Sequence, residues 1–114
     1  MIELIEVDAL LAVTEPVEME VLVGSRSPRA QRDERALLRR FEWLPFRAAM
    51  DFEGATTIYR TCRAAGVTPR GTIDCLIAAV ALRNDAVLLT ADHDLARIAE
   101  VMSIPLDPAS VEPG

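Results

Sequence analysis

Three aspartates lie at the two ends of the most apolar segment of the chain. This segment, residues 72–94, reads TIDCLIAAVALRNDAVLLTADHD, with Asp74 near its start and Asp92 and Asp94 at its end. An unpaired carboxylate among buried residues costs free energy, and carboxylates that converge repel one another unless a cation lies between them. Carboxylate oxygens are the ligands of hard divalent cations. The spacing therefore predicts an acidic metal site for Mg²⁺, with Mn²⁺ as the alternative ion.

The elements that position these aspartates follow from the apolar pattern. Residues 86–90, AVLLT, form a continuous apolar run that is typical of a buried strand. Residues 73–83 predict a helix that Thr72 caps and that is apolar on every side from Cys75 onward. Ligands of open parallel sheets bind at the carboxyl ends of the strands, so we expect Asp92 and Asp94 at the site edge. Asp74 falls in the first helical turn, where the helix dipole favours a negative charge.

The rest of the chain alternates between strands and helices. A strand from Leu10 leads into a helix with Pro16 in its first turn, which Gly24 ends, and Ser27 with Pro28 begins a second helix. Further segments predict a short strand at 42–46, helices at 51–65 and 95–100, and a final strand at 104–106. This order predicts an α/β fold, a parallel sheet with helices on both faces. We expect a single domain over 1–114, with a loose tail from about 108.

Composition excludes several classes of protein. The chain has 114 residues, 51% of them hydrophobic, but no apolar run long enough to span a membrane. Its acidic N-terminus is unlike a secretory signal, so we expect a cytoplasmic protein with no membrane contact. It contains no lysine, which excludes Walker A sites, Schiff-base enzymes and phosphoaspartate sites that need one. Cys62 and Cys75 are predicted to be buried hydrophobic residues rather than metal or redox groups.

Structural explanations exist for each candidate residue. Asp94 precedes LARI and suits a helix N-cap, whereas Asp92 suits a turn. Asp74 also suits the N-terminal end of a helix without any ligand. His93, the single histidine, is either a solvated residue or a general base. These residues alone leave the function open.

Basic residues gather in one segment of this acidic chain. The net charge of -6 argues against general nucleic-acid binding. However, SRSPRAQRDERALLRR contains six arginines against Asp33 and Glu34. The segment is either a solvated helix face or a binding surface, on which Arg26, Arg29 and Arg32 are the candidate RNA contacts.

Two segments resemble a known family. IDCLIAAVAL followed by LLTADHDLARIA is similar to the C-terminal half of PIN-domain ribonucleases, and LAVTEPVEMEVLVGSR is similar to their earlier acidic region. Within that superfamily the pattern resembles the VapC toxins of toxin–antitoxin pairs, over residues from about Leu10 to Ser110. The resemblance implies a PIN-like three-layer fold and a Mg²⁺-dependent endoribonuclease. It assigns catalytic and metal-binding roles to Glu20, Asp74, Asp92 and Asp94, and implies an RNA substrate, a VapB-like antitoxin and a homodimer.

The N-terminus departs from the family pattern. Members begin with a strand that ends in an aspartate followed by Thr or Ser and then Ser, and this chain has no such motif. MIELIEVDALLAV resembles instead the end of the helix before the second strand, with Asp8 as a surface turn residue. We therefore expect an N-terminally truncated domain with unpaired strand edges and weaker metal binding. An upstream start codon, a shortened sequence and a decayed gene copy all remain open.

Two functions follow from this pattern. The first is a toxin ribonuclease that cleaves RNA phosphodiester bonds with metal-activated water. The alternative is a catalytically inactive PIN-like module that binds an antitoxin or a second copy of itself.

Overall fold

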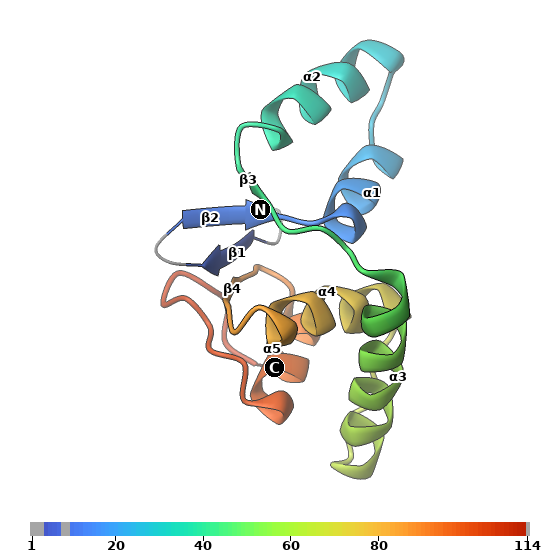
Figure 1. Ribbon diagram of the computed structural model, residues 1–114, viewed down its shortest axis with the longest axis vertical. Helices are drawn as coiled ribbons and strands as arrows, with labels where there is room; N and C mark the ends of the chain where they lie inside the picture. Colours follow the sequence, from blue (N-terminus) through green and yellow to red (C-terminus); the bar gives the residue numbers. More distant parts are fainter. Residues whose placement is uncertain (1–3, 8–9, 114) are drawn as a thin grey trace.

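The computed structural model describes residues 4–7 and 10–113, which form four strands and five helices (Figure 1). In chain order these are β1 (Leu4–Val7), β2 (Leu10–Val13), α1 (Glu15–Val23), α2 (Pro28–Leu38), β3 (Glu42–Trp43), α3 (Ala48–Ala64), α4 (Thr72–Arg83), β4 (Val87–Leu89) and α5 (His93–Met102). Within the described ranges no helix is both long and apolar enough to cross a membrane. The α/β class predicted from the sequence is confirmed.

The sheet is mixed rather than wholly parallel, in the order β3-β2-β1-β4. β2 and β3 are parallel, and β1 is antiparallel to both of its neighbours, β2 and β4. The sequence prediction that the N-terminal segment ends a helix was wrong. Ile5, Glu6 and Val7 alternate between apolar and charged, the period of a strand. Because β1 pairs along both edges, it fills the position where we expected unpaired strand edges.

α4 is the central helix of the core. Its buried residues Cys75, Ile77, Ala78, Ala79, Val80 and Ala81 lie on several sides, as the all-round apolar pattern predicts. α3 and α5 pack against α4, whereas α2 stands apart from them at the other end of the molecule (Figure 1). Small side chains let α3 approach closely, since a Cβ on Gly54 would lie 3.4 Å from the Cβ of Ala79. The helix that carries Asp74 is therefore held firmly.

Several element boundaries differ from the sequence prediction. Gly71, not Thr72, is the N-cap of α4, and α3 begins earlier than predicted, at Ala48. α5 extends over His93–Met102 and is longer than the predicted helix. The Ser27 cap of α2 is confirmed, because its hydroxyl accepts a hydrogen bond from the Ala30 N–H at 3.0 Å.

The C-terminal segment runs along β4. The predicted last strand is reduced to one parallel bridge between Leu88 and Leu106. Beyond it, the Asp107 N–H donates to the Leu88 carbonyl at 2.7 Å, and the Val111 N–H donates to the Thr90 carbonyl at 3.0 Å. Ser110 Oγ accepts a hydrogen bond from the Thr90 N–H at 3.1 Å. The segment predicted as a loose tail is thus hydrogen-bonded to the strand end that leads to Asp92.

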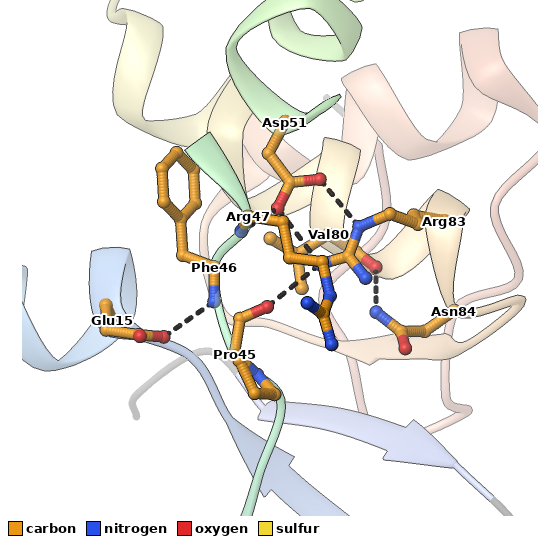
Figure 2. Close-up of polar contacts among 8 residues, drawn as sticks. All are labelled: Glu15, Pro45, Phe46, Arg47, Asp51, Val80, Arg83 and Asn84. Carbon is orange, nitrogen blue, oxygen red and sulfur yellow. Dashed lines mark hydrogen bonds and ion pairs between the residues drawn. The ribbon is translucent and has the colours of Figure 1, made fainter. Parts of the chain in front are cut away.

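A buried ion pair fixes the other end of α4 (Figure 2). Arg83 donates from Nε to Asp51 Oδ1 at 2.8 Å and from Nη2 to Oδ2 at 2.9 Å, and Asp51 is 1% exposed. Asp51 Oδ2 also accepts the Arg47 N–H at 2.7 Å, and Arg83 Nη2 donates to the Pro45 carbonyl at 2.9 Å. Nearby, the Phe46 N–H donates to Glu15 at 2.8 Å. These contacts join α1, the segment before α3, α3 and α4.

We predict that Asp51→Asn lowers the free energy of unfolding at pH 7 by about 3 kcal/mol, because the substitution leaves Arg83 without its charged partner. Chemical denaturation measures the difference. Glu53→Gln, on the exposed side of the same helix, is the matched control and is expected to change stability by less than about 0.5 kcal/mol.

The Asp51–Arg83 pair also makes the stability difference between the parent and Asp51→Asn depend on pH. Burial raises the pKa of Asp51, but the hydrogen bonds from Arg83 and the Arg47 N–H and the positive charge of Arg83 outweigh burial, so the pKa is lowered overall. A lowered folded-state pKa stabilises the fold above the unfolded pKa of about 3.9, and this stabilisation is lost as the pH falls through the folded-state value. The gap between the parent and Asp51→Asn should therefore narrow below about pH 4. An equal gap at pH 3 and pH 7 would contradict the assignment.

Candidate functional site

Three aspartates converge where β4 leads into α5. Asp74 comes from the first turn of α4, and Asp92 and Asp94 come from the start of α5. One carboxylate oxygen from each lies within 4.8 Å of those of the other two. Asp74 and Asp92 are half-buried and Asp94 is buried. The structure thus brings together the three aspartates that the sequence placed around one strand end.

Asp92, not Asp94, is the N-cap of α5. Its Oδ1 accepts hydrogen bonds from the Asp94 N–H at 2.8 Å and from the Leu95 N–H at 3.4 Å. Its own N–H donates to Thr90 Oγ1 at 2.9 Å, which fixes the turn after β4. Both capping bonds end on Oδ1, which leaves the second oxygen of the carboxylate, Oδ2, outside the cap. The cap and a ligand role are therefore compatible in one side chain.

Asp94 is paired with two arginines. Arg70 donates from Nε to Asp94 Oδ2, and Arg97 Nη1 lies 3.6 Å from Oδ1. Arg70 lies in the loop between α3 and α4, and its side chain is 78% exposed against 11% for Asp94. The hydrogen bond to Asp94 and the charge of Asp94, followed by the charges of Asp92 and Asp74, raise the pKa of Arg70. The Arg70 guanidinium thus places a positive charge close to all three carboxylates.

The donor set fits a hard divalent cation. Two oxygens bound to one Mg²⁺ at 2.0–2.1 Å are at most about 4.2 Å apart, so separations within 4.8 Å need only a small side-chain adjustment. The group consists of carboxylates alone, without the histidine or cysteine ligands that favour zinc. Mg²⁺ or Mn²⁺ would be held by Asp74, Asp92 and Asp94, with water completing the coordination.

Glu20 is not part of this cluster. It lies on an exposed side of α1, and the group of converging carboxylates found in the described ranges does not include it. The geometry therefore gathers three of the four acids that the resemblance assigns. Asp8, expected as a surface turn residue, lies outside the described residues.

The remaining candidates have ordinary environments. His93 is exposed, and its Nδ1 lies 2.8 Å from the carbonyl oxygen of Glu112, which accepts a hydrogen bond when Nδ1 carries the proton. Cys62 and Cys75 are buried, as predicted. Burial raises the pKa of Cys62 and raises the pKa of Cys75 to about 11. Both thiols therefore stay protonated near neutral pH and act as core residues.

The arginine-rich segment forms α2 and its flanks. Arg26, Arg29 and Arg32 are exposed. Arg39 instead pairs with Glu18, with Nε 3.0 Å from Oε2, and its guanidinium lies 4.8 Å from the ring centroid of Trp43. α2 therefore presents one set of arginines to solvent and uses Arg39 to attach itself to α1 and β3.

Sequence reasoning missed Arg70. It precedes the Asp74 helix in TPRGTID and looks like an ordinary loop residue. Its position shortly before Asp74 was the available signal. However, its partner Asp94 lies 24 residues further along the chain, after β4. The pairing becomes visible only when α4 and α5 lie side by side.

We predict that the two roles of Asp92 separate on substitution. Asp92→Asn keeps a good N-cap residue and should change stability by less than about 0.5 kcal/mol, whereas Asp92→Ala should cost about 1 kcal/mol. Mn²⁺ should raise the melting temperature of the parent and raise it much less in both variants. Thermal denaturation with and without Mn²⁺ measures both effects.

Asp85→Asn is the matched control for that experiment. Asp85 is exposed, lies outside the cluster and has a φ of 51°, a conformation that asparagine tolerates. It should retain the full Mn²⁺-dependent shift. An Asp92→Asn variant with an undiminished shift would exclude Asp92 as a ligand.

Known proteins are similar to this chain over most of its length. The sequence profile of the PIN domain matches residues 2–101, a range that includes all three clustered aspartates. A VapC ribonuclease of Mycobacterium bovis is 37% identical over 96 residues, which cover 84% of this chain and 72% of the relative. The ribonuclease VapC11 of Mycobacterium tuberculosis shows the same identity and coverage.

Proposed function

The chain belongs to the PIN-domain family, and from this premise we propose that it is a Mg²⁺-dependent endoribonuclease of the VapC type, the toxin of a toxin–antitoxin pair. The observation that carries the proposal is the convergence of Asp74, Asp92 and Asp94 within 4.8 Å. The similarity to VapC ribonucleases supplies the substrate class, and the all-carboxylate donor set supports Mg²⁺, with Mn²⁺ as a substitute.

The three aspartates would hold the cation. A divalent ion bound there would neutralise charge on the scissile phosphate and would lower the pKa of bound water. Asp92 keeps the turn after β4 in place through its cap, and Asp74 approaches from the N-terminus of α4. Neither a histidine nor a lysine is required. The resemblance assigns Glu20 to the site. It is proposed as a further acidic residue that takes part in catalysis once RNA and metal are bound.

Exposed arginines suit the phosphate backbone of RNA. Arg26, Arg29 and Arg32 are exposed on α2 and the segment before it. Guanidinium groups bind phosphates with paired hydrogen bonds, so this surface is proposed to bind RNA despite the net charge of -6.

Protein partners are proposed to cover exposed hydrophobic side chains. Met50, Phe52 and Leu82 are large hydrophobic residues of α3 and α4 that are 57%, 57% and 46% exposed. Association with a VapB-like antitoxin and with a second copy of the chain would cover such residues.

The inactive module remains the second candidate function. It is favoured by the position of Glu20 outside the cluster. An inactive chain would keep the apolar contacts to a partner without cutting RNA.

RNA cleavage with Mg²⁺ or Mn²⁺ tests the proposal. We predict metal-dependent cleavage that EDTA abolishes and that Asp74→Asn reduces by more than about a hundredfold, since even changes to outer-shell residues cost 10–100-fold. Asp85→Asn, the same chemical change outside the cluster, should retain activity.

Circular dichroism first establishes that each variant is folded. A folded parent chain that leaves structured RNAs intact in either metal, under conditions in which a full-length relative cuts them, would overturn the ribonuclease proposal. Binding to an antitoxin under those conditions would favour the inactive module.

A further inference from the structure

Arg70 occupies an unusual position for a surface residue. Its guanidinium bonds to the buried Asp94, the least exposed carboxylate of the cluster, yet 78% of its own side chain is exposed. All three cluster aspartates act on it electrostatically. A side chain that is held mainly by one contact at its tip can leave that contact without disturbing the core.

Arg97 differs from Arg70 in each of these respects. It belongs to α5, it reaches Asp94 from within the same helix at 3.6 Å, and it contacts Oδ1 rather than Oδ2. Its side chain is also less exposed, at 35%. Of these two arginines, Arg70 makes the closer contact with Asp94 and is the more exposed, so it is the one more easily released.

We propose that Arg70 is an exchangeable counter-ion of the carboxylate cluster: a divalent cation replaces it at Asp94, and the released guanidinium binds a phosphate of the RNA. The inference rests on the proposed function, because it assumes that the cluster holds a metal. It assigns Arg70 as a positioning residue that links metal binding to substrate binding.

Competition for the Asp94 carboxylate carries the first half of the proposal. Asp94 Oδ2 accepts the hydrogen bond from Arg70, and a metal ligand of Asp94 would use the same carboxylate. The positive charge of Arg70 at Asp94 opposes the binding of a divalent cation to this carboxylate. When Arg70 leaves, this opposition is removed.

The position of Arg70 carries the second half. The residue lies in the loop that leads into α4, next to the aspartates, so the freed group stays close to the cluster. The planar guanidinium donates two parallel hydrogen bonds to a phosphate, which an ammonium group does not. Metal loading and phosphate binding are therefore coupled through one side chain.

Metal affinity provides a test that does not depend on turnover. Calorimetric titration of Mn²⁺ into the full chain should show that Arg70→Ala binds about two- to fivefold more tightly than the parent, as expected from removing an exposed ion pair. Arg70→Lys should lie between the two. Arg63→Ala, an exposed arginine at the end of α3 with the same change in charge, should match the parent.

The affinity for RNA should change in the opposite direction to the affinity for Mn²⁺. With Mn²⁺ present, anisotropy of a labelled RNA oligonucleotide, checked for integrity on a gel, should show at least about tenfold weaker binding by Arg70→Ala than by the parent. Without metal the difference should be small, because Arg70 is then bound to Asp94. A purely structural role would instead weaken the binding of both ligands.

The outcomes separate the two proposals. A parent that binds Mn²⁺, with an Arg70→Ala variant that binds it equally or less tightly, would overturn the exchange and leave the metal site intact. A folded parent that binds no Mn²⁺ would overturn the metal site and the exchange together. Tighter metal binding without any loss of RNA affinity would overturn the phosphate role.

Discussion

Electrostatic repulsion among three carboxylates is the constraint that the candidate site must overcome. Asp74, Asp92 and Asp94 are held within 4.8 Å by the starts of α4 and α5 and the end of β4, and the Asp94 N–H donates to Asp92 Oδ1. The N-terminal ends of α4 and α5 favour negative charge, and Arg70 and Arg97 supply positive charge at Asp94. The remaining negative charge makes the cluster a site for a cation.

The positions of these aspartates depend on how firmly α4 is held. Its apolar residues are buried between α3 and α5, and its two ends carry different charged contacts. Asp74 lies at the N-terminal end, and Arg83 binds Asp51 at the C-terminal end (Figure 2). The buried pair thus stabilises the same helix that presents a cluster ligand, and the hydrogen bonds from the C-terminal segment to β4 secure the strand before Asp92.

Local sequence signals predicted the parts of the structure that depend on local chemistry. The apolar run before Asp92 and the apolar helix after Asp74 were enough to place three aspartates at one strand end. The cap of α5 was assigned to Asp94 instead of Asp92, because both residues suit a cap and only the backbone bonds to Oδ1 decide between them. Glu20 needed the family resemblance, and the structure leaves it outside the cluster.

Interactions between distant segments were not predictable in this way. Arg70 with Asp94 and Arg83 with Asp51 each join residues from separate elements, and Arg70, Arg83 and Asp51 look like surface charges in the sequence. β1 was misread for a related reason: its short strand pattern gains meaning only from pairing with β2 and β4 on either side. Pairing and packing, rather than propensity, determined these features.

The most direct test of this account is the number of Mn²⁺ ions bound per chain, measured by electron paramagnetic resonance for the parent and for Asp74→Asn. If the three aspartates form one cation site, the parent binds about one ion in the accessible concentration range and the variant loses it. If both proteins bind the same number of ions with the same affinity, the carboxylate cluster is not a metal site and the proposed chemistry fails.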